Sequence, residues 1–218
     1  MPEGVDLSVA STLPVAGLTV MRTLGLAGSV LGARVLVTGA SGGVGQLAVP
    51  LAAMSGAAVT AVTSRTDLWP ELRDLGARDV VGSIGEARGS FDLILESVGG
   101  ESLAAAIGLV GPRGIVVTIG NSSEKETTFN SRTLYAKGGA SLYGLIVFDE
   151  VECRRVGERE LERLLDLVRD GMLRPSLALR RPFEELDQAL TALGAPGKPC
   201  SRFERLASAS DVAFQRPR

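Results

Sequence analysis

A glycine-rich turn near the start of the chain has the residue types and spacing to bind a phosphate. The segment VLVTGASGGVGQLA, residues 35–48, joins a β-branched run to a turn containing Gly42, Gly43 and Gly45 and then to a helix-like stretch. Such a turn lets the backbone approach a pyrophosphate, because no side chain obstructs the N–H groups at the helix start. The spacing from Ala40 matches the dinucleotide fingerprint, with alanine in its first position. An ordinary flexible turn could contain the same glycines, so the secondary structure around the turn must show whether it belongs to a dinucleotide-binding fold.

Those elements alternate between strand-like and helix-like patterns. Residues 9–31 predict one or two helices, and strand-like runs follow, interrupted by helix-like segments and by a polar loop over residues 121–139. Two more helices are predicted at 157–171 and 182–193. The predicted strands are RVLVT, AVTAVT, DVVG, FDLILES, GIVVTIG and ASLYGLIVF. This alternation predicts an α/β fold, a Rossmann doubly wound six-stranded parallel sheet in three αβα layers.

The predicted elements divide the chain into three parts. Residues 1–30 form a helical lead-in, residues 31–198 a dinucleotide-binding domain, and residues 199–218 an irregular C-terminal tail without a steady period. The turn therefore lies between the first strand and first helix of the predicted domain, where such folds bind a dinucleotide.

Composition narrows the chemistry further. The chain has 218 residues, 45% of them hydrophobic, with two cysteines, no histidine and a formal net charge of −2. Histidine-based metal sites, catalytic triads and imidazole acid–base chemistry are excluded, and no excess of positive charge favours nucleic acid or an anionic membrane. The N-terminal stretch lacks a basic leader and the apolar runs are broken by arginine and glycine, so we expect a cytoplasmic protein with a small-molecule partner.

The end of the second strand bears on which dinucleotide is bound. NAD sites place an acidic residue there for the ribose 2′-hydroxyl, whereas NADP sites offer arginine to the 2′-phosphate. Here the candidates are Ser64 and Arg65, which favour NADPH over NADH. The alternative is that Arg65 is a solvated loop residue and that Asp67 only caps the next helix.

The turn also resembles that of short-chain dehydrogenases, since TGASGGVG fits Thr-Gly-x-x-x-Gly-x-Gly. That family uses a tyrosine followed four residues later by lysine. The two tyrosines, Tyr135 and Tyr143, are followed at that distance by Gly139 and Val147. The pair is absent, so this family is the weaker alternative.

A longer resemblance is to the cofactor-binding half of medium-chain dehydrogenases, specifically the zinc-free quinone oxidoreductase-like branch and the wider zinc-binding dehydrogenase group. The segments STLPVAGLTVMRTL, VLVTGASGGVGQLAVPLA, LRDLGARDVV, FDLILESVGG, GIVVTIG, ASLYGL and FEELDQALTAL are similar to that family over about residues 8–198. The resemblance implies strand order 3-2-1-4-5-6. It places these residues along the cofactor: Gly42, Gly43, Val44 and Gly45 at the pyrophosphate, Ser64 and Arg65 at the adenosine ribose, Val98, Gly99, Ile119 and Gly120 along the path of the adenosine and the nicotinamide, and Thr19 near the nicotinamide. For Val98 and Ile119, plain core packing is the alternative.

The resemblance also implies hydride transfer between NADPH and a small carbonyl, enone or quinone, without an assigned catalytic residue. The family's GroES-like catalytic domain is expected to be missing, so a catalytically inert NADPH-binding or interaction module is the alternative. No zinc is expected, because Cys153 and Cys200 lie in no close-spaced ligand cluster. The family's two-fold dimer is expected to form through a long apolar edge strand over Ala140–Phe148.

Overall fold

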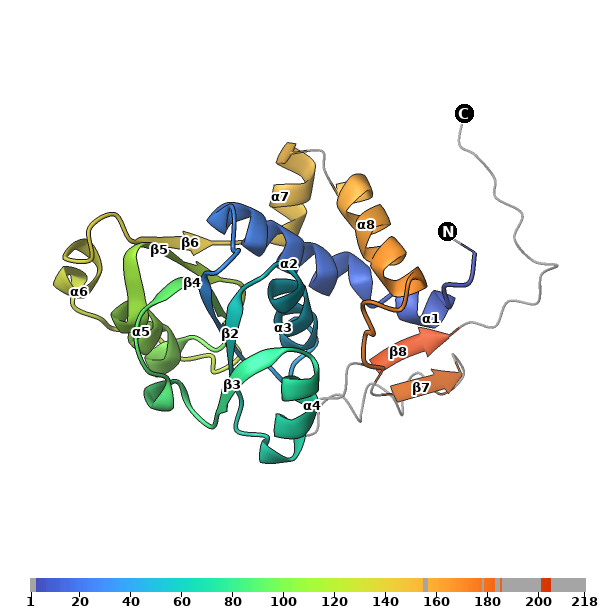
Figure 1. Ribbon diagram of the computed structural model, residues 1–218, viewed down its shortest axis with the longest axis horizontal. Coiled ribbons are helices and arrows are strands. Elements are labelled where there is room, and N and C mark those ends of the chain that lie inside the picture. The colour runs from blue at the N-terminus through green and yellow to red at the C-terminus, as the bar shows by residue number, and fades with distance from the viewer. Residues whose placement is uncertain (1–2, 155–156, 178, 183–184, 186–200, 205–218) are drawn as a thin grey trace.

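Figure 1 shows a computed structural model of the chain, which describes residues 3–154, 157–177, 179–182, 185 and 201–204. The helices are α1 (Leu7–Ala10), α2 (Leu13–Ala27), α3 (Gly45–Met54), α4 (Trp69–Asp74), α5 (Gly100–Leu109), α6 (Ser131–Tyr135), α7 (Val147–Arg154) and α8 (Gly157–Arg169), with short 3-10 turns η1 (Thr66–Leu68) and η2 (Ile84–Glu86). The strands are β1 (Arg34–Thr38), β2 (Ala58–Val62), β3 (Ala77–Val81), β4 (Phe91–Glu96), β5 (Val110–Thr118), β6 (Ser141–Gly144), β7 (Leu179–Pro182) and β8 (Ser201–Glu204).

Six strands form one sheet in the order β3-β2-β1-β4-β5-β6, and every neighbouring pair is parallel. The Rossmann fold and the strand order expected from the sequence are confirmed. The order reverses between β1 and β4, which are adjacent in the sheet although β2 and β3 separate them in the chain. In doubly wound sheets the ligand binds outside the carboxyl ends of the strands at this reversal.

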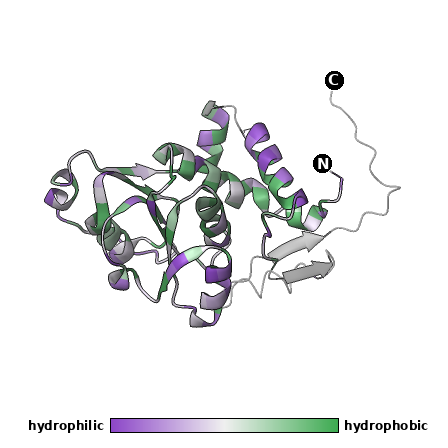
Figure 2. Cartoon of the chain, viewed as in Figure 1, coloured by the Kyte–Doolittle hydropathy of each residue, from purple (hydrophilic) through white to green (hydrophobic). Residues whose placement is uncertain are grey.

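Helices cover both faces of the sheet, because successive side chains of each strand point to opposite sides. Val35 and Val37 of β1 pack in a cluster with buried residues of α2, α3 and α8. Leu36, between them, packs in a second cluster that includes Ala106 of α5. Figure 2 shows the central strands of the six-stranded sheet largely in hydrophobic colours and the outer side of α8 in hydrophilic ones. Both sheet faces are thus buried, which explains the continuous apolar runs in the sequence.

Helix α8, near the C-terminal end of the domain, packs against α2, near its N-terminal end. Leu164 and Leu165 are buried on the apolar side of α8, and Leu164 lies so close to Gly17 of α2 that a Cβ on Gly17 would be 2.7 Å from its Cδ1. Both the predicted helix at 157–171 and the predicted helices at 9–31 are confirmed. Among the described residues, none of the helices has the length and hydropathy needed to cross a membrane.

The predicted edge strand over Ala140–Phe148 is wrong in its length. Strand β6 covers only Ser141–Gly144, and helix α7 begins at Val147. The apolar run crosses a strand–helix boundary, and apolar content alone does not mark such a boundary. Asp149 and Glu150 in the first turn of α7 are acidic residues of the kind that stabilise a helix start.

Two further predictions need correction. The polar loop expected over residues 121–139 contains helix α6, capped by the Asn130 side chain, which accepts a hydrogen bond from the Arg132 N–H at 2.9 Å. The irregular tail expected from residue 199 contains β8, which pairs in parallel with β7. A four-residue strand whose partner is distant in the chain leaves no local period to recognise. The helix predicted over 182–193 lies almost entirely outside the described residues.

Candidate functional site

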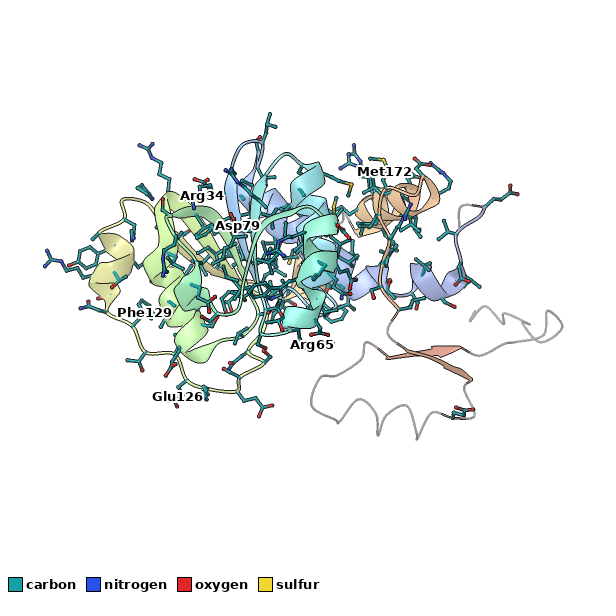
Figure 3. All side chains as sticks on the ribbon, turned by 60° about the horizontal axis from the view of Figure 1, so that its bottom comes forward. Arg34, Arg65, Asp79, Glu126, Phe129 and Met172 are labelled. Atoms are coloured by element: carbon teal, nitrogen blue, oxygen red, sulfur yellow. The ribbon has the colours of Figure 1, made fainter. Side chains whose placement is uncertain are left out.

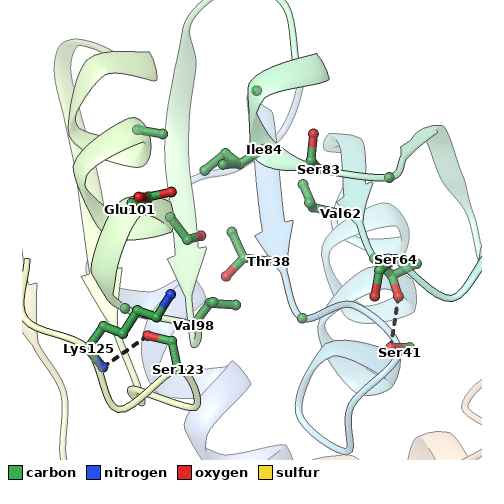
Figure 4. Close-up of a pocket in the computed structure, with 17 residues that line it drawn as sticks. Thr38, Ser41, Val62, Ser64, Ser83, Ile84, Val98, Glu101, Ser123 and Lys125 are labelled. Atoms are coloured by element: carbon green, nitrogen blue, oxygen red, sulfur yellow. Dashed lines mark hydrogen bonds between the residues drawn. The ribbon is translucent and has the colours of Figure 1, made fainter. Parts of the chain in front are cut away.

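Two neighbouring cavities lie at the carboxyl ends of the strands. The large cavity has a volume of about 660 Å³ and is bounded by the ends of β1, β2 and β3, by the start of α5 and by the loop after β5 (Figure 4). The turn cavity, of about 310 Å³, is lined by residues 41–45 of the glycine turn and by Leu95, Ser97, Ile119 and Ser122. Thr38, Gly39 and Ser41 line both cavities. Together they form a continuous site where the strand order reverses.

The glycine turn brings bare backbone to this site. A Cβ on Gly45 would lie 2.5 Å from both the Gly39 carbonyl oxygen and the Ala40 Cα, so no side chain fits where α3 begins. The described part of the chain provides no hydrogen-bond acceptor for the N–H groups of Gly43 and Val44, and both residues line the turn cavity. Unpaired N–H groups at the start of a helix attract an anion through their partial positive charge.

The buried carboxylate of Glu96 connects β4, β1 and the start of α5 at the point where the strand order reverses. Glu96, fully buried at the end of β4, accepts hydrogen bonds from the N–H groups of Val98 (3.1 Å) and Gly99 (2.9 Å) and from the Ser102 hydroxyl (2.8 Å). Its Oε1 also lies 3.2 Å from the Thr38 hydroxyl, which links β4 to β1. Because Val98, Gly99 and Ser102 line the large cavity, Glu96 fixes one wall without entering it.

A second set of hydrogen bonds fixes the end of β2. The hydroxyls of Thr63 and Ser41 lie 2.9 Å apart, which joins β2 to the glycine turn (Figure 4). The indole N–H of Trp69 donates to the Thr63 carbonyl at 3.3 Å, and the Arg65 N–H donates to the Thr63 hydroxyl at 3.1 Å. Trp69 is the only tryptophan of the chain, so its fluorescence reports on this corner of the site.

Arg65 does not line either cavity. Its guanidinium binds the Asp67 carboxylate through two contacts, Nε to Oδ1 at 3.0 Å and Nη2 to Oδ2 at 2.7 Å. The Asp67 hydrogen bond raises the pKa of Arg65, and the Arg65 guanidinium lowers the pKa of Asp67. Asp67 lies inside η1 rather than at its cap and binds Arg65, so the capping role weighed for it is not observed. Figure 3 shows Arg65 well separated from Arg34, which starts β1.

Lys125 places positive charge in the large cavity. It lies in the loop after β5, and Figure 4 shows its amino group directed inward, with Glu101 at the start of α5 above it. On the other side, Glu86 holds the loop after β3: its carboxylate accepts from the Gly82 N–H at 3.1 Å and from the Ser83 hydroxyl at 2.9 Å. Hydrogen bonds from the Gly82 N–H and, to a smaller extent, from the Ser83 hydroxyl lower the pKa of Glu86.

The structure brings together most of the residues expected at the site. Gly42, Gly43, Val44, Gly45 and Ile119 line the turn cavity, while Ser64, Val98 and Gly99 line the large one. Three expected residues line neither. These are Arg65, Gly120 and Thr19. A Cβ on Gly120 would lie 3.3 Å from the Ser97 carbonyl oxygen. Thr19 is buried, and its hydroxyl donates to the Val15 carbonyl at 2.7 Å within α2.

Ser41, Thr63, Glu96 and Lys125 are among the residues of the site that were not expected from the sequence. Ser41 lies within the glycine turn, at a position where the fingerprint accepts any residue, and Thr63 directly precedes Ser64. Glu96 ends an apolar strand, where a lone acidic residue signals a buried carboxylate with partners. Lys125 lies in a polar loop without a period, and nothing in its sequence context points to it.

Comparison with known proteins gives the family. A model of the zinc-binding dehydrogenase family matches residues 43–168, which include residues 43–45 of the glycine turn and most of the residues that line the two cavities. The chain belongs to this family. Within the described residues, no three His, Cys, Asp or Glu side chains lie close enough together to hold a metal ion. Cys153 is exposed, and Cys200 lies outside the described residues.

Relatives of this zinc-binding dehydrogenase chain are larger than the chain itself. It is 32% identical over 189 residues to the pikromycin polyketide synthase component PikAII of Streptomyces venezuelae, a match covering 80% of this chain and 5% of the synthase. The crystal structure of the CurK enoyl reductase superposes with a TM-score of 0.72 at 26% identity, covering 88% of this chain and 60% of that one. The quinone oxidoreductase of Thermus thermophilus, solved also with NADPH, gives a TM-score of 0.77 at 29% identity, covering 88% and 64%.

Proposed function

We propose that the chain binds NADPH across the two cavities. The observation that supports this most strongly is that Gly43 and Val44 line the turn cavity while their N–H groups have no acceptor within the described residues, which leaves them available to a pyrophosphate. The adenosine would then occupy the large cavity, with Ser64 at its ribose and Arg65 near enough to turn toward a 2′-phosphate. The nicotinamide half would extend toward Ile119.

We further propose that the chain is the cofactor domain of a reductase acting on a small carbonyl, enone or quinone. The names of its relatives, an enoyl reductase and a quinone oxidoreductase, support this substrate class. Bound NADPH supplies the hydride. The residues described here hold and orient the dinucleotide, and such positioning lowers the barrier to hydride transfer without an acid or base from this chain.

The reaction is tested by mixing the chain with NADPH and a panel of quinones and enones, and following the loss of nicotinamide absorbance. We expect NADPH oxidation that depends on the added acceptor. Saturable NADPH binding without oxidation of any acceptor would contradict reductase activity of this chain by itself, and would favour a binding module or a cofactor domain that needs its catalytic domain.

Replacing Lys125 by alanine is expected to weaken NADPH and NADH binding alike. The ammonium group lines the large cavity, and losing one cation beside an anionic ligand costs about three- to ten-fold in affinity at low salt. The matched control is Lys137→Ala, because the Lys137 ammonium binds the Gly108 carbonyl at 2.9 Å outside both cavities. Equal affinities of the two variants, measured by fluorescence titration, would show that Lys125 does not contact the dinucleotide.

We also propose that the chain forms a two-fold dimer through β6. This strand is the sheet edge, and Leu142 (38% exposed), Ile146 (62%) and Phe148 (69%) present apolar side chains on or just after it. An edge strand with exposed apolar neighbours is suited to pairing with its own copy.

Light scattering at micromolar concentration should therefore give a dimer, and Ile146→Lys should convert it to a monomer. Leu31→Lys is the control, since Leu31 is 79% exposed but precedes β1 in the middle of the sheet. A monomeric wild-type chain would refute the proposed dimer.

A further inference from the structure

We propose that Asp67 competes with the 2′-phosphate of NADPH for the Arg65 guanidinium and thereby sets how strongly the site prefers NADPH to NADH. This inference rests on the proposed NADPH site. Asp67 would thus affect cofactor selectivity although it lies outside both cavities and does not itself contact a bound dinucleotide.

The geometry of the ion pair supports a competition. The Asp67 carboxylate receives Nε and Nη2 of Arg65 side by side, at 3.0 and 2.7 Å. A phosphate binds arginine through the same two-point arrangement, because its oxygens have a similar spacing. One guanidinium edge therefore serves either the carboxylate or the phosphate. Arg65 must leave Asp67, at least in part, before it can bind a 2′-phosphate in this way.

The location of the pair places the competition beside the site. Ser64 lines the large cavity, whereas the next residue, Arg65, does not. The Arg65 N–H is held by the Thr63 hydroxyl at 3.1 Å, so the backbone is fixed close to the cavity while the side chain points to Asp67. Rotation of the side chain alone would redirect the guanidinium, without any change in the strand.

The pair is weak enough to open. The side chains of Arg65 and Asp67 are 50% and 61% exposed, and ion pairs in such surroundings stabilise a protein little. Because Arg65 lowers the pKa of Asp67, the carboxylate stays charged throughout the neutral range and the competition is always present there. NADH lacks the 2′-phosphate, so its binding does not require the pair to open. Asp67 thus disfavours NADPH selectively.

The test measures dissociation constants of NADPH and NADH by quenching of Trp69 fluorescence at low salt. The variants are Asp67→Asn, Arg65→Ala and the double variant, with Asp74→Asn as control. Asp74 is exposed at the end of α4, so its replacement removes the same charge from the same region without touching Arg65. Circular dichroism confirms that each variant is folded.

We expect Asp67→Asn to bind NADPH about two- to five-fold more tightly than the wild-type chain, with NADH binding unchanged. The gain should vanish in the double variant and should be absent from Asp74→Asn. Unchanged or weaker NADPH binding by Asp67→Asn would overturn the inference, as would a gain that persists without Arg65. If the wild-type chain binds NADPH more tightly than NADH but Asp67→Asn alters nothing, only the inference fails. If the wild-type chain binds neither dinucleotide, the proposed function fails and the inference fails with it.

Discussion

Replacing Glu96 by glutamine is expected to lower the free energy of unfolding by about 2–4 kcal/mol. Both carboxylate oxygens accept hydrogen bonds, from Val98, Gly99 and Ser102, and the residue is fully buried. The amide of glutamine replaces one acceptor by a donor, which then faces another donor without water to relieve it. Urea denaturation followed by circular dichroism measures the loss.

The control for this variant is Glu126→Gln, which removes the same charge from an exposed position (Figure 3). It should leave the stability within about 0.5 kcal/mol of the wild type. A stability for Glu96→Gln equal to that of the control would show that the carboxylate does not hold the β1–β4 junction. The variant should also bind NADPH more weakly, because Val98 and Gly99 form a wall of the large cavity.

Replacing Gly45 by alanine is expected to weaken dinucleotide binding at least about ten-fold and to destabilise the fold by about 1–3 kcal/mol. The new Cβ would lie 2.5 Å from the Gly39 carbonyl oxygen and from the Ala40 Cα, both of which are backbone atoms. The turn must shift to admit it, and the N–H groups of Gly43 and Val44 shift with it. Titration with NADPH and urea denaturation measure the two effects.

Gly108→Ala is the matched control, because a Cβ there meets nothing within 4 Å and the residue lies in α5, where alanine is the better helix former. It should leave NADPH affinity unchanged and stabilise the fold slightly. If Gly45→Ala binds NADPH as tightly as Gly108→Ala, the turn does not form the pyrophosphate site.

The architecture was predictable because its determinants are local. The β-branched strands, the glycine turn and the amphipathic helix α8 each have a period or composition that is visible within a short window of sequence. The boundary at Val147 was missed because residues 145–148, which lead from the end of β6 into α7, are all apolar. Helix α6 was missed because its five residues are too few for a period.

The part of the site that was predictable from spacing alone is the glycine turn, where backbone geometry dictates the residue type. A turn that approaches a phosphate requires glycine, so Gly42, Gly43 and Gly45 are recognisable from spacing alone. Lys125 and Glu96 reach the site through tertiary packing, from loops and strand ends distant in the sequence. Arg65 was expected as a phosphate ligand but lines neither cavity, and its ion pair with Asp67 became visible only from the distances between their atoms.

The proposed dinucleotide site is tested most directly by calorimetric titration of the wild-type chain with NADPH and, separately, with NADH. We expect saturable NADPH binding at one site per chain, tighter than NADH binding, because a charge-assisted contact from Arg65 to the 2′-phosphate adds to the contacts common to both dinucleotides. Equal affinities for the two would contradict the assigned preference, and an absence of binding to either would contradict the site itself.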